Sequence, residues 1–272
     1  MEQVHVATLN IRNLADRWTE RLPLLLADMA ALNPDILGLQ EVIYPMQQDR
    51  LIGAAGEAHY RVIRGWAGRP EYGNSLLVRE PLAADDPERL DLGLRRSALR
   101  ASIALPGGEE LLVVVTHLHH EVPDAAQRDD QARQLLDWLD GASRAGTDAH
   151  AMARPATAQV VMGDFNAHPQ EAAAIRMRAA GFRSAYAELH GADPAVTWPS
   201  GIQAPGMDTD GDPICLDYIW IRGAVRVESA RVVFDRPDPE DLTLFPSDHF
   251  GLAARLAIGD ALGAPPDRVV DR

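Results

Sequence analysis

Six short apolar stretches of this sequence each end in polar or charged residues, and this repetition limits what the chain can fold into more than any other feature. Buried strands hold their terminal residues rigidly while the following loops open to solvent, which is typical of a binding or catalytic cleft. A single Asn or Asp at a strand end is more often an ordinary turn residue, but six endings together favour one shared site. The endings are Asn10, Glu41, His117, Asp164 with Asn166, Asp217, and Asp248 with His249.

The hydrophobic pattern alternates between strand-like runs and helical periodicity along the whole chain. Apolar residues recur at helical spacing over residues 17–32, 125–140 and 170–180, and Asn33-Pro34 ends the first of these helices. No Pro/Gly-rich linker separates two halves, so the pattern favours a single α/β domain whose helices cover sheet faces. The predicted strands span residues 4–9, 36–39, 60–63, 75–78, 99–105, 111–116, 159–162, 216–221, 225–233 and 250–256.

Three segments are predicted to be irregular. Residues 141–157 are rich in Gly, Ala, Ser and Thr, and residues 199–213 hold three Pro, three Gly and three Asp, which predicts surface loops. The tail after Gly259 is rich in Pro, Ala and Asp, which predicts a disordered end. We therefore expect a folded domain over residues 1–259 and a disordered tail over residues 260–272.

The charge balance limits the class of partner. The 272 residues carry a formal net charge of −14, and all 26 basic residues are arginines, since the chain contains no lysine. A protein that grips long nucleic acid through its phosphates usually presents a basic face. Any basic surface here has to be local, although a bound metal ion could supply much of the positive charge that an anionic substrate needs.

The sequence carries no targeting or disulfide signal. Cys215 is the only cysteine, which excludes intramolecular disulfides and cysteine-rich zinc sites. Residues 1–5 show no basic stretch followed by an apolar run, as a signal peptide would, and no apolar run approaches membrane-spanning length. We therefore expect a soluble cytoplasmic protein with no membrane span and no obligate protein partner.

The polar endings lie in six short motifs that follow one another over residues 8–250. The motifs are Thr8-Leu9-Asn10, Leu39-Gln40-Glu41, Thr116-His117-Leu118, Gly163-Asp164-Phe165-Asn166, Leu216-Asp217-Tyr218-Ile219 and Ser247-Asp248-His249-Phe250. In this order the set resembles the endonuclease/exonuclease/phosphatase superfamily, which includes deoxyribonucleases, sphingomyelinases, inositol-polyphosphate phosphatases and deadenylases. The resemblance implies an α/β fold of four layers, with two mixed β-sheets flanked by helices, and a single catalytic domain over residues 1–259.

Glu41 and Asn10 predict a site for a hard divalent cation. Carboxylate oxygen is the ligand that Mg²⁺ prefers, usually from one or two protein carboxylates together with several waters, and Asn10 can add an amide oxygen. The resemblance implies that Asp248 completes this metal site or holds a second ion. We therefore expect Mg²⁺ or Mn²⁺ as the cofactor.

Asp164 and Asn166 flank the aromatic Phe165. In an extended backbone, residues two apart face the same side, so both polar side chains would point into the cleft while Phe165 packs away from it. Asp164 can orient or deprotonate an attacking water, and Asn166 can bind a phosphoryl oxygen.

Two histidines complete the predicted catalytic set. His249 can act as a general acid or base or can stabilise a phosphate, and the resemblance nominates Asp217 as the carboxylate that orients it. The resemblance also implies that His117 contacts the phosphoryl oxygens from the other side. Arg128 and Gln131 lie one turn into the next helix and are expected to hold the His117 loop.

The remaining assignments concern the edges of the site. Asn74 begins a strand near the position from which relatives orient the His117 equivalent, and we assign it to substrate binding. Arg100 could meet a phosphate through its bidentate guanidinium or could equally be a solvated surface arginine, and Arg96 is also expected beside the cleft. Arg12 departs from the family pattern, because apurinic endonucleases usually carry an acidic residue there that serves the metal.

Together these residues point first to the hydrolysis of a phosphate ester with a divalent metal ion and an in-line attacking water. The net charge of −14 slightly favours a small or headgroup-like phosphate substrate. The alternative is an Mg²⁺-dependent endo- or exonuclease on DNA or RNA. A catalytically silent binding module is a remote alternative, since it would lack one of the key acidic or histidine residues. A metal-free esterase lacks support, because no Gly-x-Ser-x-Gly elbow occurs.

Overall fold

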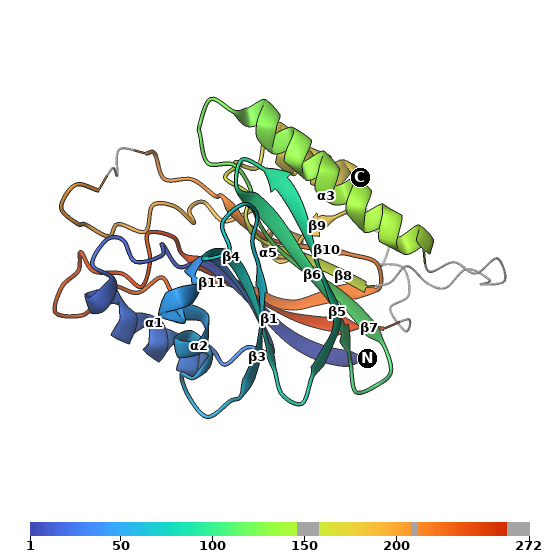
Figure 1. The fold of residues 1–272 in the computed structure, drawn as a ribbon, viewed down its shortest axis with the longest axis horizontal. Helices are drawn as coiled ribbons and strands as arrows, with labels where there is room; N and C mark the ends of the chain where they lie inside the picture. Colours follow the sequence, from blue (N-terminus) through green and yellow to red (C-terminus); the bar gives the residue numbers. More distant parts are fainter. Residues whose placement is uncertain (146–157, 208–210, 260–272) are drawn as a thin grey trace, which may run out of the picture.

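The computed structural model describes residues 1–145, 158–207 and 211–259 of the chain. Within these residues, two six-stranded β-sheets pack face to face in one domain, and helices cover their outer faces (Figure 1). Each sheet contains one parallel strand pair among antiparallel ones, so both sheets are mixed. The predicted α/β sandwich of two mixed sheets flanked by helices is therefore confirmed.

The first sheet contains the strands that open and close the domain. Its strands are β1 (Glu2–Asn10), β2 (Ile36–Ile43), β3 (Tyr60–Gly65), β4 (Tyr72–Arg79), β11 (Val225–Val233) and β12 (Gly251–Ile258). They lie in the order β11-β12-β1-β2-β4-β3, and only β1 and β2 pair in parallel among these strands. The parallel pair brings the carboxyl ends of β1 and β2 to the same edge.

The second sheet is built from the middle of the chain. Its strands are β5 (Ala83–Gly93), β6 (Arg96–Ala104), β7 (Glu110–His117), β8 (Ala158–Asp164), β9 (Arg183–Ser184) and β10 (Asp217–Arg222). They lie in the order β5-β6-β7-β8-β10-β9, with β7 and β8 as the parallel pair. As in the first sheet, two parallel strands therefore end side by side.

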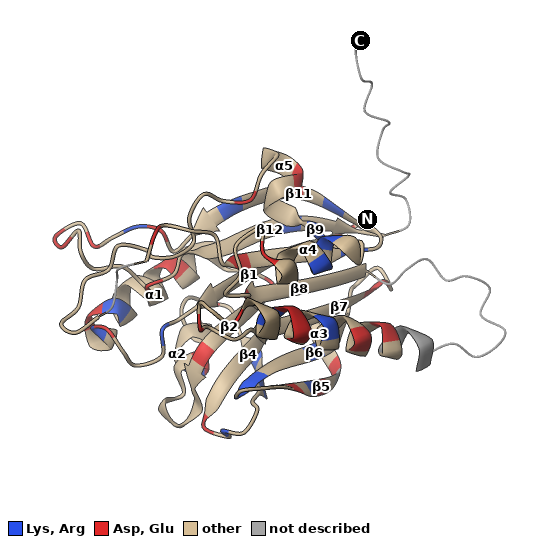
Figure 2. Ribbon diagram, turned by 90° about the horizontal axis from the view of Figure 1, so that it is seen from above, with Lys and Arg blue, Asp and Glu red and all other residues tan. Residues whose placement is uncertain are grey.

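Helices complete the outer layers. They are α1 (Trp18–Leu32), the 3₁₀ turn η1 (Tyr44–Met46), α2 (Gln48–Gly53), α3 (Ala125–Ala145), α4 (Ala172–Ala179) and α5 (Ala185–His190). Leu25 and Met29 of α1 pack with Leu37 and Leu39 on the outer face of the first sheet. The helices α3 and α4 cover the outer face of the second sheet in the same way (Figures 1 and 2).

The alternation of side chains along each strand divides the interior into three apolar layers. On β8, Val160 and Met162 face the space between the sheets, whereas Val161 packs under the helices of the second sheet. On β2, Ile36 faces the space between the sheets and Leu37 packs under α1. This two-residue period continues to the strand ends and decides which terminal side chains face the gap between the sheets.

The structure departs from the sequence prediction in several elements. Helix α3 continues to Ala145, so the prediction of an irregular segment is wrong for residues 141–145. The high helix propensity of the alanines and the arginine in this segment outweighs the low propensity of one glycine and one serine. Residues 146–157 and the predicted tail 260–272 lie outside the described residues. Strand β5 was not predicted because Pro87 interrupts its pattern, but Pro87 lies at a register shift on an edge strand, where proline is tolerated. The short elements α2, β9 and α5 were also not predicted.

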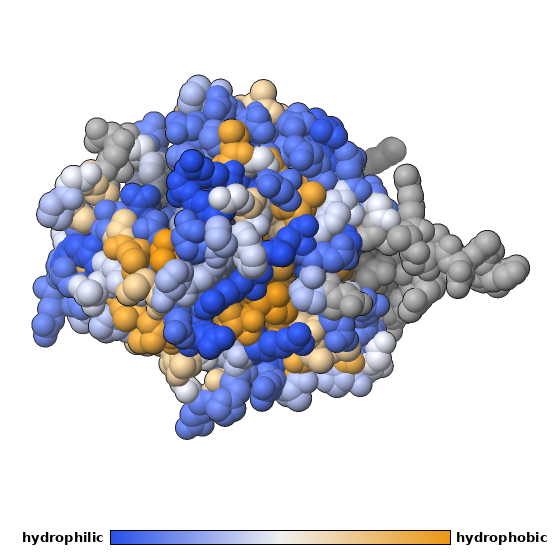
Figure 3. All heavy atoms as spheres, viewed as in Figure 1, coloured by the Kyte–Doolittle hydropathy of each residue, from blue (hydrophilic) through white to orange (hydrophobic). Residues whose placement is uncertain are grey.

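The face of the molecule drawn in Figure 3 is predominantly hydrophilic. On the face drawn in Figure 3, apolar side chains form separate patches between hydrophilic ones. Acidic and basic residues lie next to one another on α3, where Arg133 pairs with both Asp130 and Asp137 (Figure 2). Among the described helices, none has the length and apolar character needed to cross a bilayer.

Candidate active site

Four strands deliver a polar side chain into the gap between the sheets at one end of the sandwich. On β7, Val115 faces this gap, and His117 follows it two residues later in the same row. The same spacing carries Asn10, Asp164 and Asp217 into the gap from β1, β8 and β10. All four side chains are buried. The strand period therefore explains why residues distant in sequence meet here.

Asp164 lies at the centre of this group because of strand register. It is aligned with His117 on the parallel neighbour β7 and with Asp217 on the antiparallel neighbour β10. The preceding Gly163 has a φ of 138°, and a Cβ there would lie 2.0 Å from the carbonyl oxygen of Thr116. Only glycine permits this close approach of β8 to β7.

Glu41 reaches the cleft by a different route. Gln40 holds the inward position of β2 and is hydrogen-bonded to Thr8, so a regular strand would direct Glu41 toward the outer face. The pairing of β2 with β4 shifts register between Leu39 and Val42, and Glu41 has a left-handed φ of 61°. This bulge turns the Glu41 carboxylate into the cleft.

The segment after Asp164 is not extended, contrary to the sequence prediction. Asn166 has a φ of 49°, and its backbone N–H donates to Asp164 Oδ1 at 2.8 Å, which closes a tight turn. Asn166 nevertheless lines the cleft, where its side-chain amide donates to the carbonyl oxygen of Leu118 at 3.2 Å. Phe165 is fully buried in the layer under α3 and α4, as predicted.

Asp248 and His249 come from the loop before β12, and hydrogen bonds hold this loop in place. Ser247 Oγ donates to the carbonyl oxygen of Asn10 at 2.6 Å, and the backbone N–H of Ser200 donates to the carbonyl oxygen of Asp248 at 2.8 Å. Both Asp248 and His249 are buried. The loop is therefore fixed to the end of β1 as firmly as a strand end would be.

These residues border a cleft of about 880 Å³. The predicted site residues that line it are Asn10, Glu41, His117, Asp164, Asn166, Asp248 and His249. Asp217 does not line the cleft, because it lies behind His249 and contacts that ring. Five arginines of the described chain also line the cleft, namely Arg12, Arg69, Arg95, Arg96 and Arg128. The same lining holds five acidic residues, so the cleft carries charges of both signs although the chain as a whole is strongly acidic.

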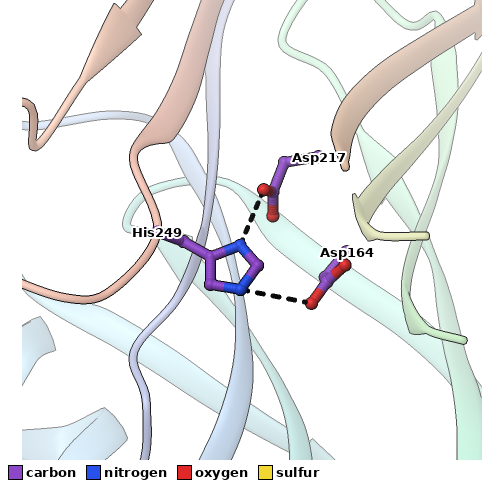
Figure 4. A group of neighbouring side chains, drawn as sticks. All are labelled: Asp164, Asp217 and His249. Atoms are coloured by element: carbon purple, nitrogen blue, oxygen red, sulfur yellow. Dashed lines mark hydrogen bonds and ion pairs between the residues drawn. The ribbon is translucent and has the colours of Figure 1, made fainter. Parts of the chain in front are cut away.

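His249 is held between two carboxylates. Its Nδ1 lies 2.8 Å from Asp217 Oδ2, and its Nε2 lies 3.7 Å from Asp164 Oδ2 (Figure 4). Burial alone would lower the pKa of His249, but Asp217, Asp164 and Asp248 outweigh burial and raise that pKa well above its usual range. Burial raises the pKa of Asp164, His249 opposes this rise and Asp217 adds to it. The arrangement is that of a protonated imidazole with an orienting carboxylate.

His117 faces Asp164 from the other side. His117 Nε2 lies 3.4 Å from Asp164 Oδ2, so one carboxylate lies between two imidazoles. Arg96 Nη1 lies 2.9 Å from the ring nitrogens of His117, and Arg96 Nη2 lies 2.9 Å from His120 Nδ1. Burial, and then the positive charges of Arg96 and His249, lower the pKa of His117 well below 6.5. His117 is therefore neutral where His249 is charged.

The side chain of Asn10 lies next to one predicted metal ligand, Glu41, and next to Asp164. Its Nδ2 lies 3.3 Å from Glu41 Oε1 and 3.0 Å from Asp164 Oδ2, and Asn13 Nδ2 donates to Glu41 Oε2 at 2.7 Å. The carboxylates of Glu41, from the first sheet, and of Asp164, from the second sheet, thus lie on either side of the Asn10 amide. Carboxylate oxygens of this kind are ligands that Mg²⁺ or Mn²⁺ prefers, and the buried Asp248 lines the same cleft, whereas Asn10 Oδ1 accepts the backbone N–H of Arg12 at 3.0 Å.

A second group of acidic and histidine residues offers a different possible metal site. Asp164, Asp217 and His249 present ligand atoms that lie within 4.8 Å of one another. However, both ring nitrogens of His249 face carboxylates, and a protonated imidazole has no lone pair for a cation. This trio is therefore better suited to proton transfer, and Asn10, Glu41 and Asp248 remain the candidate metal ligands.

Arg12 lies among the acidic groups of the cleft. Its Nε lies 2.6 Å from Asp16 Oδ2 and 3.6 Å from Asp248 Oδ2. Burial would lower the pKa of Arg12, but Asp248, Asp16 and Glu41 raise it. The position that is acidic in apurinic endonucleases thus carries a cation that pairs with a candidate metal ligand.

Asn74, which was predicted to bind substrate, does not line the cleft. It is buried, and its side chain donates to the carbonyl oxygen of Ser97 at 2.8 Å. Ser97 lies opposite His117 in the ladder between β6 and β7. Asn74 therefore supports the strand beside His117 and has no access to a ligand in the cleft.

The prediction that Arg100 binds a phosphate is wrong. Arg100 lies on the face of β6 that packs against α3, and so its side chain points away from the gap between the sheets. It is 7% exposed. Its guanidinium donates to Glu88 at 2.7 Å and to the carbonyl oxygen of Trp138 at 3.1 Å, and it lies over the Trp138 ring. It is neither a substrate ligand nor a solvated surface arginine.

Two buried arginines hold the loops of the site. Arg128 donates to Glu171 and to loop carbonyls after His117, and Gln131 accepts the backbone N–H of His119 at 2.8 Å, as the sequence suggested. The role of Arg21 was missed. Its guanidinium is fully buried and donates to the carbonyl oxygens of Ile11, Arg12, Ala15, Asp16 and Pro246. The signal was available, because Arg21 lies at helical spacing from the buried Leu25 and Met29.

Left-handed backbone conformations concentrate around the cleft. Eleven non-glycine residues in the described chain have positive φ, and six of them line the cleft, namely Arg12, Asn13, Glu41, Leu94, Arg95 and Asn166. Such conformations cost on the order of 1–3 kcal/mol each and persist where the surrounding structure enforces them. Their concentration in one place is typical of a functional site.

The sequence matches the model of the Endonuclease/Exonuclease/phosphatase family over residues 7–249. The match covers the six motifs except for the final Phe250 and confirms the resemblance that they indicated. No functionally curated protein matches the sequence.

Several solved structures share this fold. The human Nocturnin catalytic domain with bound sulfate is 23% identical with a TM-score of 0.73, covering 94% of this chain and 95% of that chain. A family member from Bacteroides thetaiotaomicron is 17% identical with a TM-score of 0.75, covering 97% and 98%. TDP2 from D. rerio, in complex with a single-strand DNA product, is 17% identical with a TM-score of 0.72, covering 94% and 100%. At these identities the similarity establishes a common fold.

Proposed function

Because the chain belongs to the endonuclease/exonuclease/phosphatase family, we propose that it hydrolyses a small or headgroup-like phosphate ester in this cleft with the help of Mg²⁺ or Mn²⁺. One observation carries the proposal: the Asp164 carboxylate lies between two histidines, one of which is bonded to Asp217. Hydrolysis of a phosphate ester requires a positioned water, a proton for the leaving oxygen and stabilisation of the phosphoryl oxygens. The cleft offers a separate group for each task.

His249 is suited to protonate the leaving group. Asp217 accepts the Nδ1–H at 2.8 Å and so directs Nε2 toward the cleft. As the oxygen of water bonds to phosphorus, the bond from phosphorus to the leaving oxygen breaks, and that oxygen takes the Nε2 proton. Asp217 acts through the ring as a positioning residue, because it has no access to the cleft.

Asp164 is suited to orient the attacking water and accept its proton. Burial favours the protonated form of this carboxyl, as the raised pKa of Asp164 indicates. His117 and Asn166 flank the same carboxylate and can donate hydrogen bonds to phosphoryl oxygens. Arg96 contacts the neutral His117 ring at 2.9 Å, which leaves one ring nitrogen to serve as a donor.

Asn10, Glu41 and Asp248 would hold the divalent ion. When bound there, the ion supplies positive charge that offsets the repulsion between a substrate phosphate and the acidic groups of the cleft. Two of these acidic groups, Glu41 and Asp164, lie within hydrogen-bond distance of the same amide nitrogen of Asn10, so their charges would repel a phosphate together.

Turnover of a substrate panel tests the proposal. The panel contains p-nitrophenyl phosphate, bis-p-nitrophenyl phosphate, nucleotide and inositol phosphates, sphingomyelin, and single- and double-stranded DNA and RNA, each with Mg²⁺, Mn²⁺ or EDTA. We expect turnover of a small ester with metal, loss of turnover with EDTA, and loss with Asp164→Asn but not with the exposed control Asp137→Asn. Preference for long DNA or RNA would overturn the assignment of substrate size, and no turnover on any substrate would overturn the function.

A further inference from the structure

We infer that Arg69, Arg95 and Arg96 form a second anion-binding subsite beside the catalytic centre, and that the substrate is a phosphate ester carrying a further phosphate group. We call these three residues the arginine rim. The inference rests on the proposed phosphoesterase function and adds the substrate's second anionic group to it.

The rim differs from the other arginines that line the cleft in having no acidic partner. Arg12 pairs with Asp16, and Arg128 pairs with Glu171. Within the described chain, the side chains of Arg69 and Arg95 are exposed and form no ion pair or hydrogen bond with protein groups, while Arg96 contacts only the imidazoles of His117 and His120. In a chain with a net charge of −14, three guanidinium groups without a carboxylate on one side of a cleft form a local positive surface.

The rim lies directly beside the proposed phosphate site. Arg96 contacts the His117 ring at 2.9 Å, and His117 faces Asp164. The two exposed arginines come from neighbouring loops, since a Cβ on Gly68 would lie 4.0 Å from Arg95 Cγ. A phosphate bound at Asp164 and His117 would therefore have the rim next to it, within reach of a second group on the same small molecule.

The turn that carries Arg95 supplies an independent argument. Leu94 and Arg95 form the two-residue connection between β5 and β6, and their φ values are 51° and 61°. Positive φ at both central positions defines the turn type that strongly favours Asn-Gly. A leucine and an arginine are poorly suited to this backbone, so local stability does not explain their presence. A strained residue whose side chain lines a cleft is better explained by a role in binding.

The chemistry of the rim favours phosphate over other anions. The guanidinium group is planar, keeps its charge at all relevant pH values and matches phosphate oxygens with two parallel donors. Three such groups suit a doubly charged phosphate or a bridging phosphodiester better than a single carboxylate. The rim therefore selects substrates with a second phosphate, which can be a terminal phosphate of a small molecule or the next phosphate of a nucleotide chain.

Three chromogenic substrates test this inference with the full chain at saturating Mn²⁺. Thymidine 5′-(p-nitrophenyl phosphate) has one phosphate, its 3′-phosphorylated form adds a terminal phosphate, and the p-nitrophenyl ester of dithymidylate adds an internucleotide phosphodiester. We expect KM to fall about tenfold when either second phosphate is present, with little change in kcat. Preference for the terminal phosphate indicates a small bisphosphate, and preference for the phosphodiester indicates a nucleotide chain.

Arginine variants connect that preference to the rim. Arg69→Gln and Arg95→Gln should each reduce it about threefold, as expected for exposed ion pairs, and the double variant should reduce it about tenfold. Arg255→Gln is the matched control, because Arg255 is also exposed but lies on β12 outside the cleft. Replacing Leu94 and Arg95 together by Asn-Gly should raise Tm and reduce the preference about threefold, as Arg95→Gln does, which separates binding from folding.

The inference fails if the wild type shows no preference for a second phosphate, or if the double variant keeps that preference, while all three esters are still hydrolysed. If none of the three esters is hydrolysed, the proposed function fails instead. In that case calorimetric titration of thymidine 3′,5′-bisphosphate with EDTA present still tests the rim. Binding that weakens about tenfold in the double variant supports the subsite, and unchanged or absent binding overturns it.

Discussion

The buried centre of the cleft and the arginine rim are both charged, but they are built in opposite ways. Asp164, Asp217 and His249 are at most 5% exposed, and each is fixed by strand register or by hydrogen bonds. Arg69 and Arg95 are exposed, lie on loops and form no ion pair or side-chain hydrogen bond with the residues that the structure describes. The difference separates two tasks, because bond breaking requires groups in fixed positions whereas substrate choice can be left to variable loops.

Substitutions in the buried centre of the cleft should have the largest effect on activity. We expect His249→Ala to lower kcat by about 10²- to 10⁴-fold, because a positioned acid or base contributes on this order. Asp217→Asn should cost less, since Asp217 acts only through the His249 ring at 2.8 Å. The double variant should be hardly worse than His249→Ala in steady-state kinetics on the best substrate. Fully additive losses would show that the two residues act independently.

The contrast between centre and rim also explains what the sequence could predict. Asn10, His117, Asp164 and Asp217 were identifiable because each continues an apolar inward row of a strand. The single α/β domain with helices over its sheet faces followed from the hydrophobic periodicities, and the two mixed sheets were implied only by the resemblance that the six motifs carry. These features are local in sequence, so no knowledge of tertiary contacts was needed.

Features that depend on contacts between distant segments escaped prediction. Arg100 was assigned to substrate binding because the sequence alone does not show which face of β6 points into the gap between the sheets. In the structure, Arg100 lies on the opposite face, toward α3. Glu41 was predicted as a metal ligand and does line the cleft, but the bulge that turns it inward was not foreseen. Arg95 lies in a loop with no periodic signal, and only its conformation and missing partners reveal it.

The centre also depends on support from outside the cleft. Arg21→Met should destabilise the protein by about 3 kcal/mol or more, because five carbonyl oxygens lose their buried donor. Activity should fall as well, since Pro246 directly precedes the loop of Asp248 and His249. Chemical denaturation and kinetics measure the two effects. Arg133→Met on the exposed face of α3 is the control and should leave Tm unchanged, and an Arg21 variant as stable as this control would contradict the prediction.

Glu41 tests whether the metal belongs to the centre. Glu41→Gln keeps the volume of the side chain but removes an anionic oxygen, so the apparent affinity for Mn²⁺ should fall by about 10- to 100-fold. The thermal midpoint measured with EDTA present should change little, because Asn13 can still donate to the amide oxygen. Calorimetric titration of Mn²⁺ reads the affinity directly. The same titration curve for variant and wild type would show that Glu41 is not a ligand.

A buried histidine far from the cleft tests the effect of burial on a pKa where a single carboxylate, Asp35, opposes it. His5 lies on β1, and burial lowers its pKa to about 4, with the largest further contribution from Arg255. Below pH 6.5 the unfolded chain binds a proton on His5, whereas the folded chain binds it only near pH 4. The free energy of unfolding therefore falls as the pH decreases from 6.5 to about 4. His5→Gln should remove about 1 kcal/mol of this loss, a value discounted for solvent screening. Identical pH dependence of unfolding in both proteins would contradict the lowered pKa.

The smallest expected effect concerns salt and distinguishes the rim from an extended nucleic-acid surface. Each phosphate that a protein neutralises on a single strand contributes a slope of about −0.7 to the dependence of log affinity on log salt. The rim offers three guanidinium groups without acidic partners, so 1/KM for the best substrate should fall with a slope no steeper than about −2 at saturating metal. Arg69→Gln with Arg95→Gln should flatten the slope by about 1, whereas Arg255→Gln should leave it unchanged. A slope several times steeper in the wild type would mean that many phosphates are contacted, and the substrate would then be a long polynucleotide held by surfaces beyond the rim.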